Sequence, residues 1–337
     1  MVADVDPLQV SEEMLQFLEQ HLPRDTASHS KAFTLAYTTL DPYLLAFKYD
    51  PSITLSAEEA FRKKTGNCLS FSNLFIALAR AAGLKAWYQE VEVPQNWSNI
   101  NETLLIGKHV NAVVEGSGSK FVRSHYVVDV SREGLADEST SHKISDDEAR
   151  AQFYNNLGAD ALVDEELAEA YAYFAKGIET APGISYIWSN LGVVLRRNNQ
   201  PEDAKSTYLV ALELNPGDLV ALNNLYSLYL EEGNESEAKN VHARVERHRH
   251  LNPFYLQQLS TEAVEEQRYD DAITLLKQAI KIDGNEYRFH LALARTLLLD
   301  GNEKAAQLSL NRAKQLAPAD RKLSNVELIQ LADGTDI

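Results

Sequence analysis

The second half of this chain repeats itself every 34 residues, and this period constrains its fold more than any other feature. In the second unit, Leu191 and Gly192 stand at positions 7 and 8, and Pro216 stands at position 32. Similar residues recur in register in five units, which span 151–184, 185–218, 219–252, 253–286 and 287–320. A unit of this length makes one helical hairpin, which buries its apolar face only by stacking on its neighbours. We therefore expect an all-α superhelix over 151–320, followed by a capping helix or tail at 321–337.

The pattern resembles the tetratricopeptide repeat (TPR), which has large residues such as Trp188 and Tyr208 at positions 4 and 24. Small residues at positions 8 and 20 let the two helices of a hairpin approach closely, while larger residues fill the seam between hairpins. The third unit departs most from this pattern. It has His242 and Val245 at two signature positions, and its proline comes late, at Pro253. We expect looser packing or a longer helix there.

The resemblance implies that the repeats bind an extended peptide or a helix in a concave groove lined by the first helix of each hairpin. The candidate groove residues are Tyr186, Arg196, Arg197, Asn223, Ser227, Phe254, Gln257, Arg288 and Arg295. Several arginines in an acidic protein favour an acidic peptide or a carboxylate terminus as partner. Two alternatives stay open: each residue is ordinary surface, or the repeats serve homo-oligomerisation.

Charge excludes one class of partner. The formal net charge is -17, with acidic residues in both halves, whereas nucleic-acid binding needs lysine and arginine gathered on one face. No apolar stretch approaches the ~20 residues that span a bilayer. The first ten residues, MVADVDPLQV, lack the basic and apolar segments of a signal peptide. As printed, the sequence predicts a cytoplasmic protein, and a periplasmic or lipid-anchored one is left open.

The N-terminal half carries the residues suited to chemistry. The segment after Gly66 has apolar residues at helical spacing, with Asn67 as a plausible N-cap and Gly83 as a plausible helix end. Cys68 therefore falls in the first turn of a buried helix. Free backbone N–H groups and the positive end of the helix dipole stabilise a thiolate at that place. Cys68 is also the single cysteine of the chain, so an internal disulfide is impossible.

Three strands are expected after this helix, at Lys85–Val93, Lys108–Val114 and Phe121–Val130. The second contains His109 and the third contains Asp129. If the connecting loop has an odd number of residues, His109 lies opposite Val127, and Asp129 lies diagonally beside it on the same face. An even number of loop residues would put His109 and Asp129 on opposite faces of the sheet. The stretch 94–107 is expected to be a loop, either edging a cleft or plain surface.

A cysteine at a helix start, then a strand histidine and a strand aspartate, resembles the transglutaminase-like superfamily, relatives of papain-type thiol enzymes. The resemblance covers about 55–132 and implies an α+β papain-like domain over 1–145, with N-terminal helices. It implies a Cys68 nucleophile, a His109 base and an Asp129 that orients the imidazole. Members of the family often carry Trp two residues after the histidine, where this chain has Asn111.

The sequence as a whole predicts thiol-dependent amide-bond chemistry by a hydrolase or an acyltransferase, on a peptide or protein recruited by the repeats. Hydrolysis is favoured over amine transfer. The alternative is an inactive adaptor that uses both domains only to bind, with Cys68 as an ordinary core residue. His125 is the competing base. A single cysteine and the absence of HxxxH or CxxC spacing predict no metal site, and no cofactor motif is present.

Overall fold

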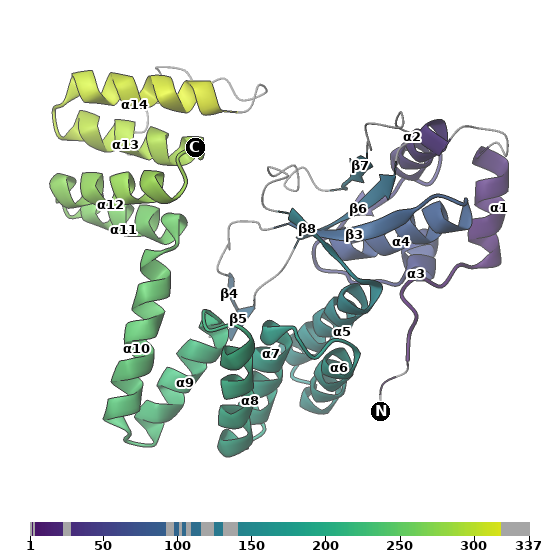
Figure 1. Cartoon of the computed structure of the whole chain (residues 1–337), viewed down its shortest axis with the longest axis horizontal. Coiled ribbons are helices and arrows are strands. Elements are labelled where there is room, and N and C mark those ends of the chain that lie inside the picture. Colours follow the sequence, from purple (N-terminus) through teal and green to yellow (C-terminus); the bar gives the residue numbers. More distant parts are fainter. Residues whose placement is uncertain are drawn as a thin grey trace. The chain divides into compact units, whose positions relative to one another are not determined.

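The computed structural model describes residues 2, 4–22, 28–91, 98–100, 103–105, 109–115, 125–130 and 141–317, of which 28–30, 98–100, 103–105 and 248–249 are described for the backbone alone. The chain divides into two compact units, Met1–Gly233 and Asn234–Ile337. The division falls inside the third predicted repeat. The chain has the expected class, an α+β domain followed by a run of helices (Figure 1).

The N-terminal part of the first unit is built from one central helix and a sheet. In chain order it contains α1 (Glu12–His21), α2 (Ser28–Leu40), β1 (Lys48–Tyr49), α3 (Ala57–Lys63), β2 (Thr65–Gly66), α4 (Cys68–Ala81), β3 (Ala86–Val91), β4 (Ser98–Ile100), β5 (Thr103–Leu105), β6 (His109–Glu115), β7 (His125–Val128) and β8 (Ser141–Ile144). The main sheet is antiparallel with the order β7-β6-β3-β8.

The structure contains strands at two places where none was expected from the sequence. The stretch 94–107, expected to be a loop, contains the two-stranded hairpin β4–β5. The edge strand β8 was not predicted at all. It pairs with β3 through Val91–Ser141 and Tyr88–Ile144. Only four residues long, it alternates too briefly for a sequence pattern to reveal it.

Helix α4 forms the core of this part. Its residues Leu74, Phe75 and Leu78 are completely buried. They share one hydrophobic cluster with Val110, Ala112 and Val114 of β6. Two polar contacts fix the helix on the sheet: the Ser72 hydroxyl donates to the Val110 carbonyl at 3.0 Å, and the Tyr88 hydroxyl donates to Asn73 Oδ1 at 2.7 Å. The start of α4 is thereby held in a fixed place beside β6.

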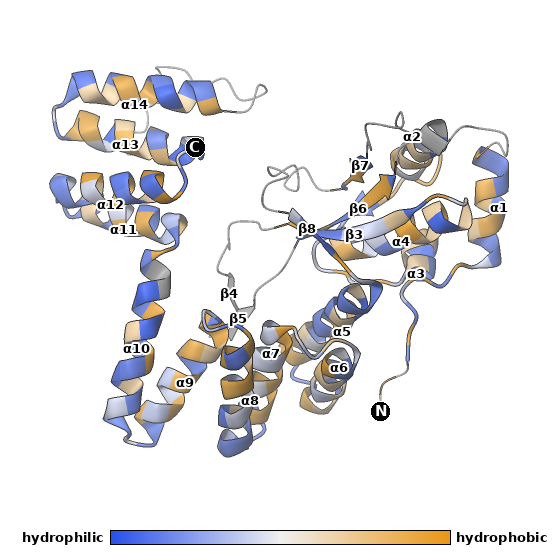
Figure 2. Cartoon of the chain, in the orientation of Figure 1, coloured by the Kyte–Doolittle hydropathy of each residue, from blue (hydrophilic) through white to orange (hydrophobic). Residues whose placement is uncertain are grey.

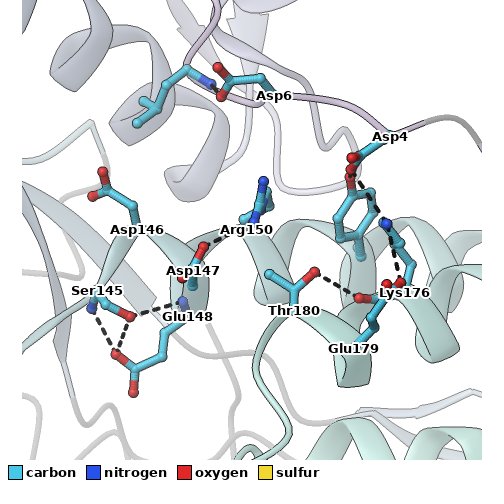
Figure 3. A network of polar contacts seen from close by, with 12 residues as sticks. Asp4, Asp6, Ser145, Asp146, Asp147, Glu148, Arg150, Lys176, Glu179 and Thr180 are labelled. Carbon is cyan, nitrogen blue, oxygen red and sulfur yellow. Dashed lines mark hydrogen bonds and ion pairs between the residues drawn. The ribbon is translucent and has the colours of Figure 1, made fainter.

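Helix α5 (Asp146–Val163) joins the sheet to the helical repeats. It begins five residues before the predicted repeat boundary, with Ser145 and Glu148 forming a capping box (Figure 3). Its residues Phe153 and Tyr154 are buried in the same hydrophobic cluster as α4. The N-terminal segment adds to this contact, since Val5 N–H donates to the Tyr154 hydroxyl at 2.9 Å.

The same connection extends to the next helix. In Figure 3, Asp4 reaches Lys176 of α6, with Asp4 Oδ1 and Lys176 Nζ 3.7 Å apart. The Tyr154 hydroxyl donates to Asp4 Oδ1 at 3.0 Å. Residues near the N-terminus and helices of the first repeat therefore belong to one compact unit.

The remaining helices are α6 (Leu167–Thr180), α7 (Ser185–Arg197), α8 (Pro201–Leu214), α9 (Leu219–Glu231), α10 (Glu235–His250), α11 (Pro253–Glu265), α12 (Tyr269–Ile282), α13 (Tyr287–Leu299) and α14 (Glu303–Leu316). Among them, α7 pairs with α8, α11 with α12 and α13 with α14, as expected of helical hairpins. In Figure 2 hydrophobic and hydrophilic residues alternate along α13 and α14, as in helices that bury one face. Helix α10 has 16 residues, whereas α6, α8, α12 and α14 have 14, so the longer helix expected in the third repeat is present.

The spacing of glycine and aromatic residues has a direct cause inside the first two hairpins. A Cβ added at Gly192 would lie 2.4 Å from a ring carbon of Tyr208, and one at Gly158 would lie 2.8 Å from a ring carbon of Phe174. The aromatic residue at position 24 therefore packs onto the glycine of its own hairpin. Our expectation that it fills the seam between hairpins was incomplete.

Candidate functional site

Cys68 is the first residue of α4 and is partly exposed. The Asn67 side chain caps the helix by accepting the Ser70 N–H at 2.9 Å. Asn67 Nδ2 in turn donates to Thr54 Oγ1 at 2.7 Å, and Ser70 Oγ accepts the Leu55 N–H at 2.8 Å. The start of α4 is thus braced by the segment in front of α3. Asn67 was predicted from the sequence, whereas Thr54 and Ser70 were not. The three-residue spacing from the cap was a signal for Ser70 alone.

The structure brings His109 and Asp129 together. His109 begins β6, and Asp129 follows the last residue of β7. His109 Nε2 and Asp129 Oδ2 are 2.7 Å apart, and both side chains are more than 90% buried, with exposures of 8% and 5%. A close contact of two buried groups that can each carry a charge fixes the orientation of the imidazole.

The expected register was half right. The nine residues 116–124 separate the paired Glu115 and His125, an odd number, so His109 and Asp129 share a face as predicted. Val127, however, pairs with Val113 and not with His109. The hairpin is longer than expected by sequence, which moves the pairing along β6 but leaves its parity unchanged.

The charge state of His109 follows from its surroundings. Burial of the ring by itself lowers the pKa of His109, but hydrogen bonds to Asp129 and Cys68 and the charges of these two groups outweigh it and raise the pKa to about 10. Since Nε2 contacts Asp129, the second ring nitrogen, Nδ1, is the one left for Cys68. The imidazole therefore stands between the thiol and the carboxylate and is held protonated at neutral pH.

His125, the competing base, lies elsewhere. It pairs with Glu115 at the opposite end of β7 from Asp129, and its side chain is exposed. Its ring lies edge-on to Trp87 with the centroids 6.2 Å apart, and Lys143 Nζ lies 5.1 Å from the centre of the Trp87 ring. His125 thus belongs to a surface cluster on β3, β7 and β8.

The predicted groove residues all lie on first helices, α7, α9, α11 and α13, but several are occupied by internal contacts. Arg196 Nη2 lies 2.5 Å from Glu231 Oε1, and Arg197 Nη1 donates to the Leu162 carbonyl at 3.2 Å. Asn223 Nδ2 donates to the Leu219 carbonyl at 2.7 Å, within its own helix. Arg196 and Arg197 thus connect neighbouring repeats of the first unit.

Tyr186 stands in the first turn of α7. Its hydroxyl is buried, and burial together with the charges of Glu90 and Glu148 raises the pKa of Tyr186 well above its ordinary value. The residue as a whole is partly exposed, so the contact of Tyr186 with a peptide in the groove stays a prediction.

In the second unit, Arg288 lies over the Phe254 ring, with the guanidinium carbon 4.8 Å from its centre, and Arg288 Nε contacts Glu286 Oε1 at 2.8 Å. Gln257 and Arg295 are partly exposed on α11 and α13. Ser227, in the first unit, donates to the Asn223 carbonyl at 3.2 Å. Phe254, Gln257, Arg288 and Arg295 stay candidates for contacts with a partner.

No group of three or more histidine, cysteine, aspartate or glutamate side chains arranged to hold a metal ion is found among the described residues. Over the same part of the chain, no helix is both long enough and apolar enough to cross a bilayer.

Two kinds of known family match this chain. The profile of the transglutaminase-like superfamily matches residues 20–129, which contain Cys68, His109 and Asp129. Tetratricopeptide-repeat profiles match residues 185–218 and 263–326. The fused architecture expected from the two sequence patterns is thereby confirmed.

Two curated relatives match parts of this chain. The tetratricopeptide repeat-containing protein trd-1 of Caenorhabditis elegans is 22% identical over 210 residues, which are 61% of this chain and 26% of that protein. This chain therefore spans about a quarter of that relative. The photosystem I assembly protein Ycf3 of Rippkaea orientalis is 31% identical over 144 residues, 40% of this chain and 68% of that protein.

Among solved structures, MamA of Desulfovibrio magneticus RS-1 is 17% identical and has a TM-score of 0.28, with 50% of this chain and 94% of MamA covered. The structure of Pseudomonas aeruginosa PilF is 17% identical, with a TM-score of 0.30, and the match covers 56% of this chain and 83% of PilF.

Proposed function

Because the chain belongs to the transglutaminase-like superfamily through residues 20–129 and carries tetratricopeptide repeats behind that domain, we propose that Cys68, His109 and Asp129 perform amide-bond chemistry on a peptide or protein recruited by the repeats. The single observation that supports this most is the 2.7 Å contact between His109 Nε2 and Asp129 Oδ2, with Cys68 as the other partner of the same imidazole. A thiol, an imidazole and a carboxylate in this order are the parts of a nucleophilic acyl-transfer site.

The steps follow from the position of each group. The Cys68 thiolate attacks the carbonyl carbon of the substrate amide and forms a tetrahedral intermediate. The C–N bond then breaks, the His109 imidazolium gives its proton to the departing amine, and a thioester remains on Cys68. Water attacks the thioester, neutral His109 accepts the water proton, and the Cys68 thiolate leaves as the carboxylic acid forms.

Asp129 and the helix act without taking part in bond exchange. Asp129 holds His109 through Nε2, so that Nδ1 carries the proton that moves. The N–H groups at the start of α4 favour negative charge on Cys68 and on the oxygen of the tetrahedral intermediate. An amine in place of water gives a transamidation by the same steps. We propose hydrolysis as the principal reaction, with an amine as the competing acceptor.

The first experiment is the pH dependence of Cys68 alkylation by iodoacetamide in the full chain. Wild type is expected to react rapidly well below pH 8, because protonated His109 stabilises the thiolate. In His109→Ala, the rate is expected to rise only near about 8.5, where an unperturbed thiol ionises. His125→Ala is the matched control and should keep the wild-type profile, since His125 lies at the other end of β7.

Either failure favours the adaptor. A wild-type profile that already follows an ordinary thiol, or a thiol that does not react at all, would remove the basis for catalysis and leave two domains that only bind. If the thiolate is activated, peptide libraries incubated with and without hydroxylamine separate the two acceptors, because hydroxylamine captures a thioester as a hydroxamate.

A further inference from the structure

A small apolar cavity lies beside the proposed catalytic groups and is lined by residues of α2 and β7. Its volume is about 250 Å³. The lining residues are Ala32, Phe33, Ala36, Tyr126, Val127, Val128 and Asp129. Asp129 is therefore both a wall of this cavity and the partner of His109.

The size and chemistry of the cavity restrict what it holds. Pockets for whole small-molecule ligands or cofactors have volumes of roughly 300–1,000 Å³, so this cavity is suited to one side chain. Among the residues that line it, none is basic, and Asp129 is the single carboxylate. That carboxylate contacts His109 and is 5% exposed, so it presents little charge to the cavity.

Apolar groups also mark the entrance. Phe33 is 72% exposed and Tyr126 is 37% exposed, although both contribute to the lining. Large apolar side chains left in contact with water at the edge of an apolar hollow gain free energy when a further apolar group covers them. An aromatic or branched aliphatic side chain would fit the apolar walls and would also cover Phe33 and Tyr126 at the entrance.

We propose that this cavity is a specificity subsite that receives an apolar side chain of the substrate whose amide Cys68 attacks. The proposal rests on the proposed function, since it takes the substrate to lie across His109 and Asp129. It goes further by naming the substrate class: peptides with an aromatic or large aliphatic residue within a few positions of the scissile bond. Phe33, Ala36 and Tyr126 are the residues that select it.

The test compares acyl-tripeptide chloromethyl ketones as labels of Cys68 in the full chain. One series carries phenylalanine in turn at each of the three positions, with alanine elsewhere. An all-alanine probe and a matching lysine series are the references. At one position, phenylalanine is expected to raise the labelling rate about tenfold over alanine, and lysine is expected to give no increase.

Two variants change the cavity and one serves as control. Ala36→Phe fills the cavity and is expected to bring the phenylalanine-to-alanine ratio close to one. Phe33→Ala removes an exposed wall, which the fold tolerates, and is expected to lower the ratio severalfold. Tyr43→Ala removes an aromatic residue that is 94% exposed and does not line the cavity, and it should leave the ratio unchanged.

Failure of the subsite can be distinguished from failure of the proposed function. Iodoacetamide reports the activation of Cys68 without entering a side-chain subsite, and its rate should be equal in all three variants. Calorimetric binding of the unreactive peptides to Cys68→Ser measures the same preference without any chemistry. A preference that is absent in both assays, that favours lysine, or that survives in both Ala36→Phe and Phe33→Ala would overturn the subsite.

Discussion

At the scale of single residues, the site depends on three ionisable groups whose mutual contacts offset the cost of removing their charges from water. A buried imidazole next to a carboxylate and a thiol is stabilised in its charged form only while these partners are present. The pKa of about 10 for His109 expresses this balance, because burial lowers it and Asp129 and Cys68 raise it. Removing one partner should therefore change a measurable proton affinity without removing any apolar core.

The first prediction concerns Asp129→Asn. The folded protein binds the His109 proton more tightly than the unfolded chain, whose pKa is close to 6.5. The contribution to the free energy of unfolding is therefore fully present below pH 6.5 and is lost as the pH rises towards 10. Asp129→Asn should lower the His109 pKa by about one to three pH units, and NMR titration of the ring measures this shift.

Urea unfolding supplies the matching stability measurement. The stability difference between wild type and Asp129→Asn should be largest near pH 6 and should shrink towards pH 10. His125→Gln, on the same strand, should show no such pH dependence. A difference that grows between pH 6 and pH 10 would contradict the role of Asp129 as the stabilising partner.

The three site residues could be predicted from the sequence because a helix N-cap marks the place of Cys68, and strand alternation marks the places of His109 and Asp129. Asn67 before an apolar helix placed Cys68 at the helix start. Strand alternation placed His109 and Asp129 on one face, for which only the parity of the loop mattered. The partner of His109 across the hairpin could not be predicted, because register depends on loop length and packing that a single sequence does not encode locally.

At the scale of elements, the start of α4 is defined by a glycine. Gly66 has φ +150°, a conformation that side chains disfavour, and a Cβ there would lie 2.5 Å from Ser70 Cβ. Ser70 Oγ also accepts the Leu55 N–H. Ser70 therefore contacts both Gly66, in front of the helix, and the segment that precedes α3. The backbone of Gly66 thus allows Cys68 to be placed where it is.

We expect Gly66→Ala to lower the free energy of unfolding by about 1–3 kcal/mol, through strain and the contact with Ser70. It should also slow Cys68 alkylation, since the first turn has to shift. Gly83→Ala is the matched control at the other end of α4, where φ is +80° and no atom lies within 4 Å of an added Cβ. That variant should cost only about 1 kcal/mol and leave alkylation unchanged, as thermal unfolding and labelling rates would show. Equal labelling rates in the two variants would argue against a positioning role for Gly66.

The repeats were predictable for a similar reason. Glycine at position 8 and an aromatic ring at position 24 are two halves of one contact, as Gly192 and Tyr208 demonstrate. The same pair stands 34 residues earlier as Gly158 and Phe174, and in the last two units a small residue at position 8 goes with a leucine at position 24. The strands β4, β5 and β8 carry no such constraint, because short strands at a sheet edge are selected by their neighbours and not by their own pattern.

At the scale of the molecule, sequence patterns and compact units divide the chain at different places. The repeat pattern begins at 151, yet α5 starts at Asp146 and buries Phe153 and Tyr154 in the cluster formed by α4 and the sheet. The Arg80 guanidinium contacts Asp146 at 2.6 Å, which attaches the first turn of α5 to α4. The 34-residue period predicts contacts between hairpins. It does not predict that a helix such as α5 also packs against the sheet domain.

The two units should therefore unfold as Met1–Gly233 and Asn234–Ile337, and not as an enzyme-like domain and a repeat domain. Phe153→Ala, a repeat residue by sequence, should destabilise the first unit by about 3–5 kcal/mol. In this variant, calorimetry should show the transition of the first unit, which includes the sheet domain, at a lower temperature. Leu276→Ala, completely buried in the second unit, should cost about 2–5 kcal/mol and shift the other transition alone.

Cys68 reports which transition belongs to which unit, because its labelling during slow heating follows the opening of α4. In Phe153→Ala, labelling should begin at a lower temperature, whereas in Leu276→Ala it should begin as in wild type. If Leu276→Ala advanced the labelling of Cys68 and Phe153→Ala did not, the sheet domain would be coupled to the C-terminal repeats instead of to α5. The burial of Phe153 and Tyr154 beside α4 is the contact that connects the first repeat to the helix carrying the thiol.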